Sequence, residues 1–278
     1  MTDHVSGKTI LITGAGGGFG RLVSLKAASA GAKIVATDIN EAGLKETVDM
    51  VEAEGGTAFG MAGDVSKLED LKALCAKAVE LHGRVDVMIN NAGVMPLAFY
   101  SDHEAAKDAW YRCIDINIKG VLNGMISVYD QMMAQGAGHI INISSIYGNF
   151  PTAGAGVYGA SKAAVNFLSE SLRVESQGKI KVTIVKPTGV PATNLGAGVI
   201  NPEAIVGILG QNAPTYLATM AALAEGKGTP EQMDVERPEY AALDPGYIAD
   251  AVIHAINQPA GVSVGDITMR ATGDAYIL

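Results

Sequence analysis

Cysteine and metal-binding patterns are scarce in this chain of 278 residues. Its two cysteines, Cys75 and Cys113, are far apart, which rules out a disulfide framework and a CxxC zinc or redox site. A reducing compartment fits best, so we expect a cytoplasmic protein. The five histidines form no HExxH motif and no close pair, so we expect no catalytic zinc and no other metal site.

Positive charge is also in short supply. Lys and Arg number 20 against 29 Asp and Glu, which gives a formal net charge of −9. A protein that binds duplex nucleic acid needs a basic face, so nucleic acid is not an expected partner. Apolar residues make up 48% of the chain and charged residues 18%, which suits a large buried core and excludes wholesale disorder.

The sequence contains no convincing membrane or targeting segment. Residues 1–8 are short and polar and lack the apolar region of a secretory signal. Residues 204–224 carry no charge, and a bilayer span needs about 20 residues. However, Gln211, Asn212 and Pro214 lie in the middle and would leave polar groups unpaired in lipid. We therefore expect two short apolar helices broken at Pro214, and no membrane partner.

Short apolar runs rich in β-branched residues alternate with segments of helical pattern. The expected strands are 8–13, 33–38, 57–64, 85–90, 139–143, 181–185 and 265–269. The expected helices are 21–30, 41–54, 67–82, two within 102–135, 158–177 and 245–257. This alternation predicts an α/β fold with a parallel sheet and right-handed crossovers. No linker divides the chain, so we expect one domain over residues 1–278, with a long and therefore functional connection at 188–243.

Three glycines, Gly14, Gly18 and Gly20, follow the first expected strand and precede the first helix. Glycine there allows a tight turn and lets backbone N–H groups approach an anion, and the helix N-terminus adds favourable partial charge. The strand–turn–helix context favours a phosphate-binding loop. The alternative is an ordinary tight turn between strand and helix.

Asp38 ends the second expected strand. A carboxylate there can accept hydrogen bonds from both ribose hydroxyls of an adenosine and would repel a 2′-phosphate. Residues 15–19, 39 and 40 include no Lys or Arg to neutralise that phosphate. The pattern therefore favours NAD over NADP. The alternative is that Asp38 merely caps the helix that starts at Glu41.

Tyr158 and Lys162 are spaced i, i+4, which puts both side chains on one face of a helix. A tyrosine has an ordinary pKa of about 10 and is a poor base near neutrality. A fixed ammonium nearby stabilises the phenolate and lowers that pKa, so the pair can exchange a proton with an alcohol or ketone. Ser144 and Ser145 follow the fifth strand, where ligands bind in open α/β sheets, and both are candidates to hold the substrate oxygen.

These motifs together resemble the classical short-chain dehydrogenases/reductases. The pattern TGxxxGxG occurs at 13–20, Asp64-Val65 follows the third strand, NNAG occurs at 90–93, and Tyr158 and Lys162 form YxxxK. The resemblance implies a Rossmann-like, doubly wound parallel sheet of about seven strands with helices on both faces. It selects Ser145, three residues before Gly148 and thirteen before Tyr158, as the catalytic serine. It assigns Asn117 to a water-linked proton relay through Lys162.

The resemblance also implies a set of cofactor-binding residues, with NAD as the cofactor. They are Gly14, Gly18, Phe19, Gly20, Asp38, Ile39, Asp64, Val65, Asn91, Ala92, Gly93, Tyr158, Lys162, Pro187, Val190 and Thr193. The stretch 187–190 departs from the family's Pro-Gly-x-Val-x-Thr, because its glycine is displaced by one position. Val190 still fits as a backbone contact to the carboxamide. Whether Thr188 or Thr193 contacts the nicotinamide or its diphosphate stays open.

The sequence thus predicts an NAD-dependent alcohol dehydrogenase/ketone reductase. From 192 to 224 only Glu203 is charged, so this apolar stretch is interpreted as a lid over the substrate or as an oligomer contact. No Lys or Arg is committed to a substrate anion, which favours an uncharged hydrophobic or aromatic secondary alcohol or ketone. The alternatives are an NADPH-dependent ketoacyl-type reductase and a non-catalytic nucleotide sensor. The resemblance also implies a homo-oligomer, a dimer or tetramer.

Overall fold

A seven-stranded parallel sheet forms the centre of the protein in the computed structural model, which describes residues 3–191 and 193–277. The strand order is β3-β2-β1-β4-β5-β6-β7, with every neighbouring pair parallel. The strands are β1 (Thr9–Thr13), β2 (Lys33–Thr37), β3 (Thr57–Gly60), β4 (Val87–Asn90), β5 (Gly138–Ile143), β6 (Ile180–Pro187) and β7 (Asp266–Met269). The predicted doubly wound, Rossmann-like fold is confirmed.

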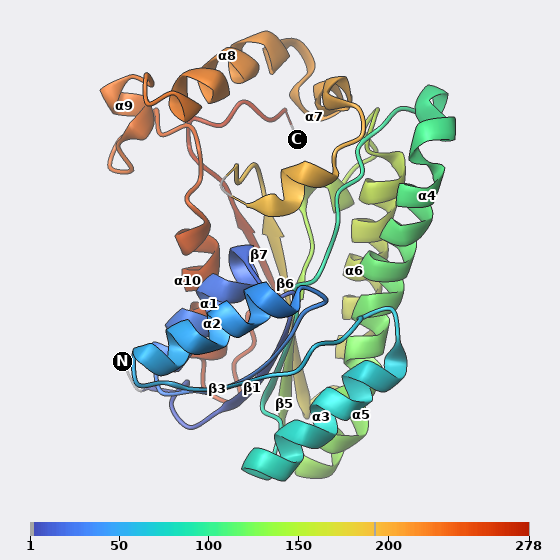
Figure 1. The fold of residues 1–278 in the computed structure, drawn as a ribbon, viewed down its shortest axis with the longest axis vertical. Coiled ribbons are helices and arrows are strands. Elements are labelled where there is room, and N and C mark those ends of the chain that lie inside the picture. The colour runs from blue at the N-terminus through green and yellow to red at the C-terminus, as the bar shows by residue number, and fades with distance from the viewer. Residues whose placement is uncertain (1–2, 192, 278) are drawn as a thin grey trace.

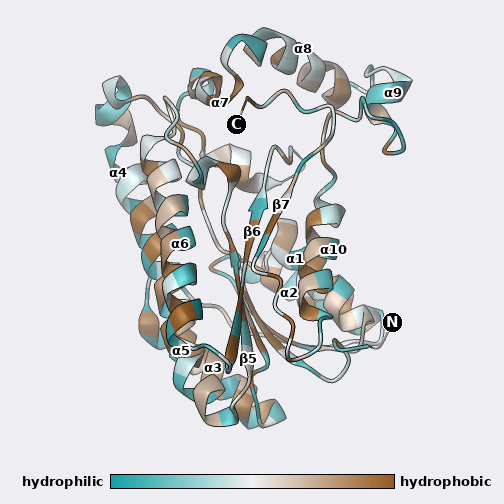
Figure 2. Ribbon diagram, turned by 180° about the vertical axis from the view of Figure 1, so that it is seen from behind, coloured by the Kyte–Doolittle hydropathy of each residue, from teal (hydrophilic) through white to brown (hydrophobic). Residues whose placement is uncertain are grey.

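Helices cover both faces of this sheet (Figure 1). One face packs against α1 (Gly18–Ser29), α2 (Glu41–Ala53) and α10 (Pro245–Ile256). The other packs against α3 (Leu68–His82), α5 (Val121–Gln135) and α6 (Gly156–Glu175), with α4 (His103–Cys113) beside α6. Figure 2 shows the central strands mostly in the colour of hydrophobic residues, as expected for strands buried on both sides.

Strand β1 illustrates why these runs become central strands. All five of its residues are buried. Successive side chains of a strand point to opposite faces. Ile10 and Ile12 accordingly join the apolar core under α1, α2 and α10, and Leu11 joins the core under α3, α5 and α6. Because both faces of this strand are apolar, it is stable only where helices cover the sheet on both sides.

The long connection after β6 lies over the carboxyl ends of the strands, at the top of Figure 1. It contains the short helices η4 (Asn194–Gly198), η5 (Pro202–Ile205), α7 (Val206–Leu209) and η6 (Gly210–Asn212), then α8 (Ala213–Ala224) and α9 (Pro230–Met233). The predicted break occurs at Gly210, which has φ 54°, and Pro214 instead lies in the first turn of α8. Proline suits a first helical turn because its missing N–H has no partner to lose there. None of the helices described in 3–191 and 193–277 is both long and apolar enough to cross a membrane.

One helical segment differs from its expected form. Residues Ile114–Gly120 between α4 and α5 form a π-helix, designated η2, whereas the sequence predicts ordinary helix there. A π-helical turn inserts one extra residue per turn and is common at functional sites. It carries Asn117, and the side chain of Asn117 is completely buried.

Candidate active site

A cavity of about 940 Å³ opens at the carboxyl edge of the sheet. Residues that follow β1, β2, β4, β5 and β6 line it, as expected for a ligand site in a doubly wound fold. Every residue predicted to bind the cofactor lies on its wall except Gly20. Of the predicted catalytic residues, Ser145, Tyr158 and Lys162 line the cavity and Asn117 does not.

The glycine loop 14–18 forms the floor of one end of the cavity. Gly14 has φ 67°, and a Cβ on it would lie 2.8 Å from the Cα of Ala92. Gly18 has φ 50° and faces open space at the first turn of α1, whose N-cap has no side-chain hydrogen bond. Backbone N–H groups at this helix start are therefore available to an anion. Gly20 has a packing role instead, because a Cβ on it would lie 2.2 Å from the carbonyl oxygen of Gly14.

The NNAG segment holds the glycine loop from the side of β4. The Asn91 amide Nδ2 donates to the carbonyl oxygens of Thr13 and Gly14 at 2.9 and 3.0 Å. In return, the Thr13 hydroxyl oxygen accepts from the backbone N–H groups of Asn91 and Ala92 at 3.0 and 3.1 Å. These bonds join the ends of β1 and β4 and fix the shape of the loop.

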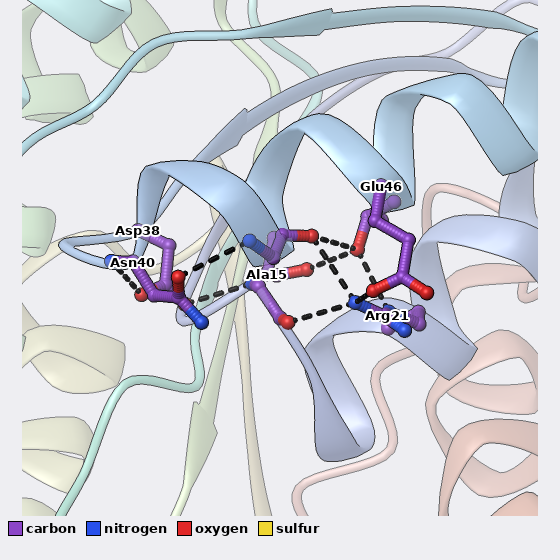
Figure 3. Close-up of polar contacts among 8 residues, drawn as sticks. Ala15, Arg21, Asp38, Asn40 and Glu46 are labelled. Atoms are coloured by element: carbon purple, nitrogen blue, oxygen red, sulfur yellow. Dashed lines mark hydrogen bonds and ion pairs between the residues drawn. The ribbon is translucent and has the colours of Figure 1, made fainter.

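Asp38 contacts the glycine loop directly (Figure 3). Its Oδ2 accepts from the backbone N–H of Gly16 at 2.7 Å, and its Oδ1 accepts from that of Asn40 at 2.8 Å. The capping alternative for Asp38 is wrong, because Asn40 is the N-cap of α2 and its side chain accepts from Gly43. The Asp38 carboxylate therefore lies where it lines the cavity and orients the loop.

Arg21 is a positioning residue that the sequence patterns do not reveal. Its Nη2 donates to the carbonyl oxygens of Gly16 and Gly43 at 3.0 and 3.2 Å and pairs with Glu46 at 2.6 Å, as Figure 3 shows. Its Nε donates to the hydroxyl of Thr47 at 3.0 Å. The guanidinium thus ties the loop to α2 from outside the cavity wall. Its position just past the glycines is the one signal in the sequence that points to it.

Tyr158 and Lys162 lie on the first half of α6 with their side chains buried, 2% and 4% exposed. The Lys162 Nζ lies 5.8 Å from the centre of the Tyr158 ring and donates to the carbonyl oxygen of Ile143 at 2.8 Å. The sequence predicts that Lys162 lowers the pKa of Tyr158, but in the structure burial raises this pKa, and a hydrogen bond with Ser145 acts in the opposite direction. Burial lowers the pKa of Lys162 to about 8. The tyrosine, lysine and serine predicted from the motifs therefore meet at one point.

The structure also separates the two serines. The Ser144 hydroxyl is turned towards α6, 2.6 Å from the Asn166 Oδ1 and 3.2 Å from the carbonyl oxygen of Lys162. Ser145 is the N-cap of a short helix, η3 (Ile146–Gly148), where its hydroxyl oxygen accepts from the N–H of Tyr147 at 3.3 Å. That bond leaves the hydroxyl hydrogen of Ser145 able to donate to an oxygen beside Tyr158.

The side-chain amide of Asn117 forms hydrogen bonds with the backbone near the site. Its Oδ1 accepts from the N–H of Val94, and its Nδ2 donates to the carbonyl oxygen of Val94, both at 2.9 Å. The Nδ2 also lies 3.0 Å from the Ser161 hydroxyl oxygen. These bonds fasten the chain after NNAG to the π-helix. The relay through Lys162 stays a prediction, because the side chain of Asn117 is occupied by these partners.

Comparison with known proteins agrees with this geometry. The family profile described as short chain dehydrogenase matches residues 8–203. The chain belongs to the short-chain dehydrogenase/reductase family. It is 36% identical over 272 residues to an uncharacterized oxidoreductase of Listeria monocytogenes, covering 98% of this chain and 99% of that protein. An uncharacterized oxidoreductase of Thermotoga maritima is 36% identical over 209 residues, covering 73% of this chain and 81% of that protein.

Solved structures give the same result. A short-chain dehydrogenase/reductase from Burkholderia phymatum in complex with NAD has a TM-score of 0.74 and 30% identity, over 96% of this chain and 90% of that one. A metagenomic short-chain oxidoreductase in complex with NADP has a TM-score of 0.72 and 26% identity, over 96% and 98%. Membership of the family makes the protein an oxidoreductase.

The half of the cavity beyond Tyr158 is mainly apolar. Its apolar wall comes from loops and from the connection above the sheet, namely Met95, Leu97, Ile146, Val199, Ile205 and Leu217. Three tyrosines, Tyr147, Tyr216 and Tyr276, add hydroxyl groups. Among the described lining residues the cationic side chains are Arg112 and Lys162. Burial raises the pKa of the Asp64 carboxyl group, but hydrogen bonds from Ser66 and the charges of Lys67 and Arg112 outweigh it and lower that pKa.

The connection after β6 faces two cavities. Met220, within the apolar stretch 192–224, is half-buried and lines a separate cavity of about 500 Å³ between α8, α9 and the C-terminal tail. Leu217, one turn earlier on α8, faces the catalytic cavity instead. Thr188 and Thr193 both line that cavity, but the Thr188 hydroxyl bonds to Asp274 at 3.3 Å and that of Thr193 donates to the carbonyl of Val190 at 3.2 Å.

Proposed function

We propose that this short-chain dehydrogenase/reductase transfers a hydride between NAD(H) and an uncharged, hydrophobic or aromatic secondary alcohol or ketone. The observation that carries the proposal is the placement of Ser145, Tyr158 and Lys162 in the same cavity as Asp38 and the glycine loop. One cavity thus contains both the groups that can transfer a proton and the groups that suit a dinucleotide.

The residues at the glycine loop fit such a cofactor. The carboxylate of Asp38 is held by Gly16 and Asn40 and still lines the cavity, where it can accept from ribose hydroxyls. Arg21, the nearest arginine to the loop, is paired with Glu46 and lies outside the cavity wall, so it does not offer a partner for a 2′-phosphate. These contacts support NAD over NADP.

Each catalytic side chain has a defined task in the proposed reaction. The bound nicotinamide supplies the hydride acceptor or donor. Tyr158 takes the hydroxyl proton when the alcohol is oxidised, or returns it to the oxygen when the ketone is reduced. Lys162 stabilises the phenolate as a fixed cation, and Ser145 donates a hydrogen bond to the reacting oxygen.

The direct test is turnover of a panel of hydrophobic secondary alcohols with NAD and with NADP, followed by NADH or NADPH absorbance. We expect activity with NAD and a much lower kcat/KM with NADP. Tyr158→Phe should lower kcat by several orders of magnitude while NADH binding stays near that of the wild type, because only the hydroxyl is lost. Near-normal turnover by this variant would falsify the assignment of the base.

The proposal extends to assembly and location. Large apolar side chains are exposed on η2, α5 and α6, namely Ile114, Leu122, Ile126, Phe167 and Val174. Exposed apolar patches of this kind mark interaction surfaces, so we propose that the protein forms a homo-oligomer through them, in the cytoplasm. Light scattering should give a mass of two or four chains, and Phe167→Glu should lower it. A monomeric wild type would refute this assembly.

A further inference from the structure

The C-terminal tail of the protein re-enters the catalytic cavity. After β7 the chain turns back beneath α8, and its last described residues lie close to α7 (Figure 1). Two hydrogen bonds hold the tail to the overlying connection. The Asn212 Nδ2 donates to the carbonyl oxygen of Ala275 at 2.9 Å, and the N–H of Ile277 donates to the carbonyl oxygen of Ile208 at 3.1 Å. Tyr276 lies between these points and lines the cavity.

A second set of bonds fixes the tail from the side of the sheet. Asp274 accepts from the guanidinium of Arg270 at 3.0 and 2.7 Å. The same carboxylate lies 3.3 Å from the Thr188 hydroxyl and 3.3 Å from the backbone N–H of Tyr276. The side chain of Asp274 is only 4% exposed, so this is an ordered anchor. Tyr276 is therefore built into the site at a defined position.

Gly189 makes room for that tyrosine. A Cβ on Gly189 would lie 1.9 Å from the Tyr276 hydroxyl oxygen, so any other residue there would displace the ring. Gly189 has no left-handed φ, which means that space rather than backbone conformation requires glycine. The ring of Tyr276 thus explains why a glycine occupies position 189.

The hydroxyl of Tyr276 is paired with that of Tyr216 at 3.0 Å, with ring centres 5.5 Å apart. Two hydroxyl groups contain two hydrogens, and the bond between them uses one. No other hydrogen bond to either hydroxyl occurs within residues 3–191 and 193–277. One donor is thus left over, together with acceptor lone pairs, on an otherwise mainly apolar wall.

We propose that Tyr276, with Tyr216, determines substrate specificity by hydrogen-bonding a second, uncharged oxygen of the substrate, a hydroxyl or carbonyl group away from the reacting carbon. The inference rests on the proposed function and adds a substrate class to it: oxygenated hydrophobic alcohols and ketones. A neutral donor–acceptor pair suits such a group, whereas a carboxylate or phosphate would call for a cation.

The test compares substrates that differ by one oxygen. The probes are 1-phenylethanol, 1-phenylethane-1,2-diol and 1-(4-hydroxyphenyl)ethanol, assayed for kcat/KM with NAD and for Kd by calorimetry. We expect the wild type to prefer at least one oxygenated alcohol about tenfold or more, the effect of one well-placed hydrogen bond. Tyr276→Phe should remove that preference and leave 1-phenylethanol almost unaffected. Tyr247→Phe, the same change on α10 outside the cavity, is the matched control.

The outcomes separate the two proposals. A protein that binds the alcohols with the expected ratio of Kd values but turns none of them over contradicts the proposed function and supports the role of Tyr276. Turnover with equal ratios in the wild type and in Tyr276→Phe overturns the role of Tyr276 and keeps the function. Gly189→Ala is a second test. It should abolish the preference for the oxygenated alcohol and speed amide hydrogen exchange in residues 271–277. Unchanged exchange and preference in this variant would also count against the proposal.

Discussion

The carboxylate of Asp38 accepts a 2.7 Å hydrogen bond from the backbone N–H of Gly16. One side chain at the end of β2 thereby shapes the glycine loop at the end of β1. A Cβ on Gly16 would lie 2.9 Å from the Cγ of Asp38, so the contact requires glycine at this position. The residue that we propose to select the nucleotide is thus also a structural part of the loop that would hold the diphosphate.

Substitutions at Asp38 should separate these two roles. Asp38→Asn keeps one oxygen that can accept from Gly16 but removes the negative charge and the acceptor for the Asn40 N–H, so we expect tighter binding of NADP and a moderate loss of NAD affinity. Asp38→Ala removes both oxygens as well as the charge, and NAD affinity should fall further. Titration of each variant with both nucleotides, followed by fluorescence, measures the four Kd values. A wild type that already prefers NADP would contradict this interpretation of Asp38.

The buried ammonium of Lys162 should lower the free energy of unfolding of the protein. Its pKa falls from 10.5 to about 8 because burial disfavours the ammonium. Below pH 8 both folded and unfolded states are protonated and the full cost is present, about 3 kcal/mol. As pH rises from 8 to 10.5 the cost disappears. Allowing about 1 kcal/mol for the lost bond to Ile143, Lys162→Met should stabilise the fold by about 2 kcal/mol at pH 7, while abolishing activity.

Urea unfolding of both proteins at pH 7 and at pH 10 measures this difference. It should be largest at pH 7 and shrink towards pH 10. Lys179→Met, which changes an exposed lysine, should leave stability unchanged. A Lys162→Met protein less stable than the wild type at pH 7 would show that the bond to Ile143 outweighs the burial of the charge.

His139 should make the fold sensitive to acid. The Thr183 hydroxyl donates to the carbonyl of Val264 at 2.6 Å, so it accepts from the His139 Nε2 at 2.8 Å and the neutral ring is protonated there. Burial, with help from Lys181 and Lys8, lowers the pKa of His139 from 6.5 to about 3. Its contribution to stability is complete above pH 6.5 and is lost as pH falls towards 3, about 2 kcal/mol by pH 5.

The measurement is the free energy of unfolding between pH 7 and pH 5. His139→Gln can still donate to Thr183 but does not titrate, so its stability should fall less over this range than that of the wild type. His254→Gln changes an exposed histidine and should follow the wild type. Parallel curves for the wild type and His139→Gln would mean that folding does not lower the pKa of His139.

Helix α8 offers a matched pair of positions for testing the cover of the site. Leu217 lines the catalytic cavity, and Met220 lines the neighbouring one. Leu217→Gln should raise the KM of hydrophobic substrates several-fold, with little change in the Kd of NADH, since the glycine loop lies at the other end of the cavity. Met220→Gln should leave KM unchanged. A larger effect at Met220, or dissociation of an oligomer by Leu217→Gln, would mean that α8 serves an interface.

The order of the strands and helices and most of the cofactor wall could be predicted from the amino-acid sequence. Buried parallel strands are local apolar runs, and the loop residues at their carboxyl ends meet at one edge whatever the details of packing, so Gly14, Asp38 and Ser145 were predictable from order and spacing. Tyr158 and Lys162 were also predictable as neighbours, because residues four apart in a helix lie on one face, one turn apart.

The packing of distant elements against each other sets which side chains complete the site. Tyr276 and Gly189 are far apart in the sequence, and no local sequence pattern predicts that the C-terminal tail packs against the end of β6. Arg21, which holds Gly16 and Gly43 together, and Asn117, which a π-helix turns towards Val94, depend likewise on how separate elements pack. Met220 shows the same limit: helical periodicity places it on an apolar face, but the neighbours of α8 decide which cavity that face adjoins.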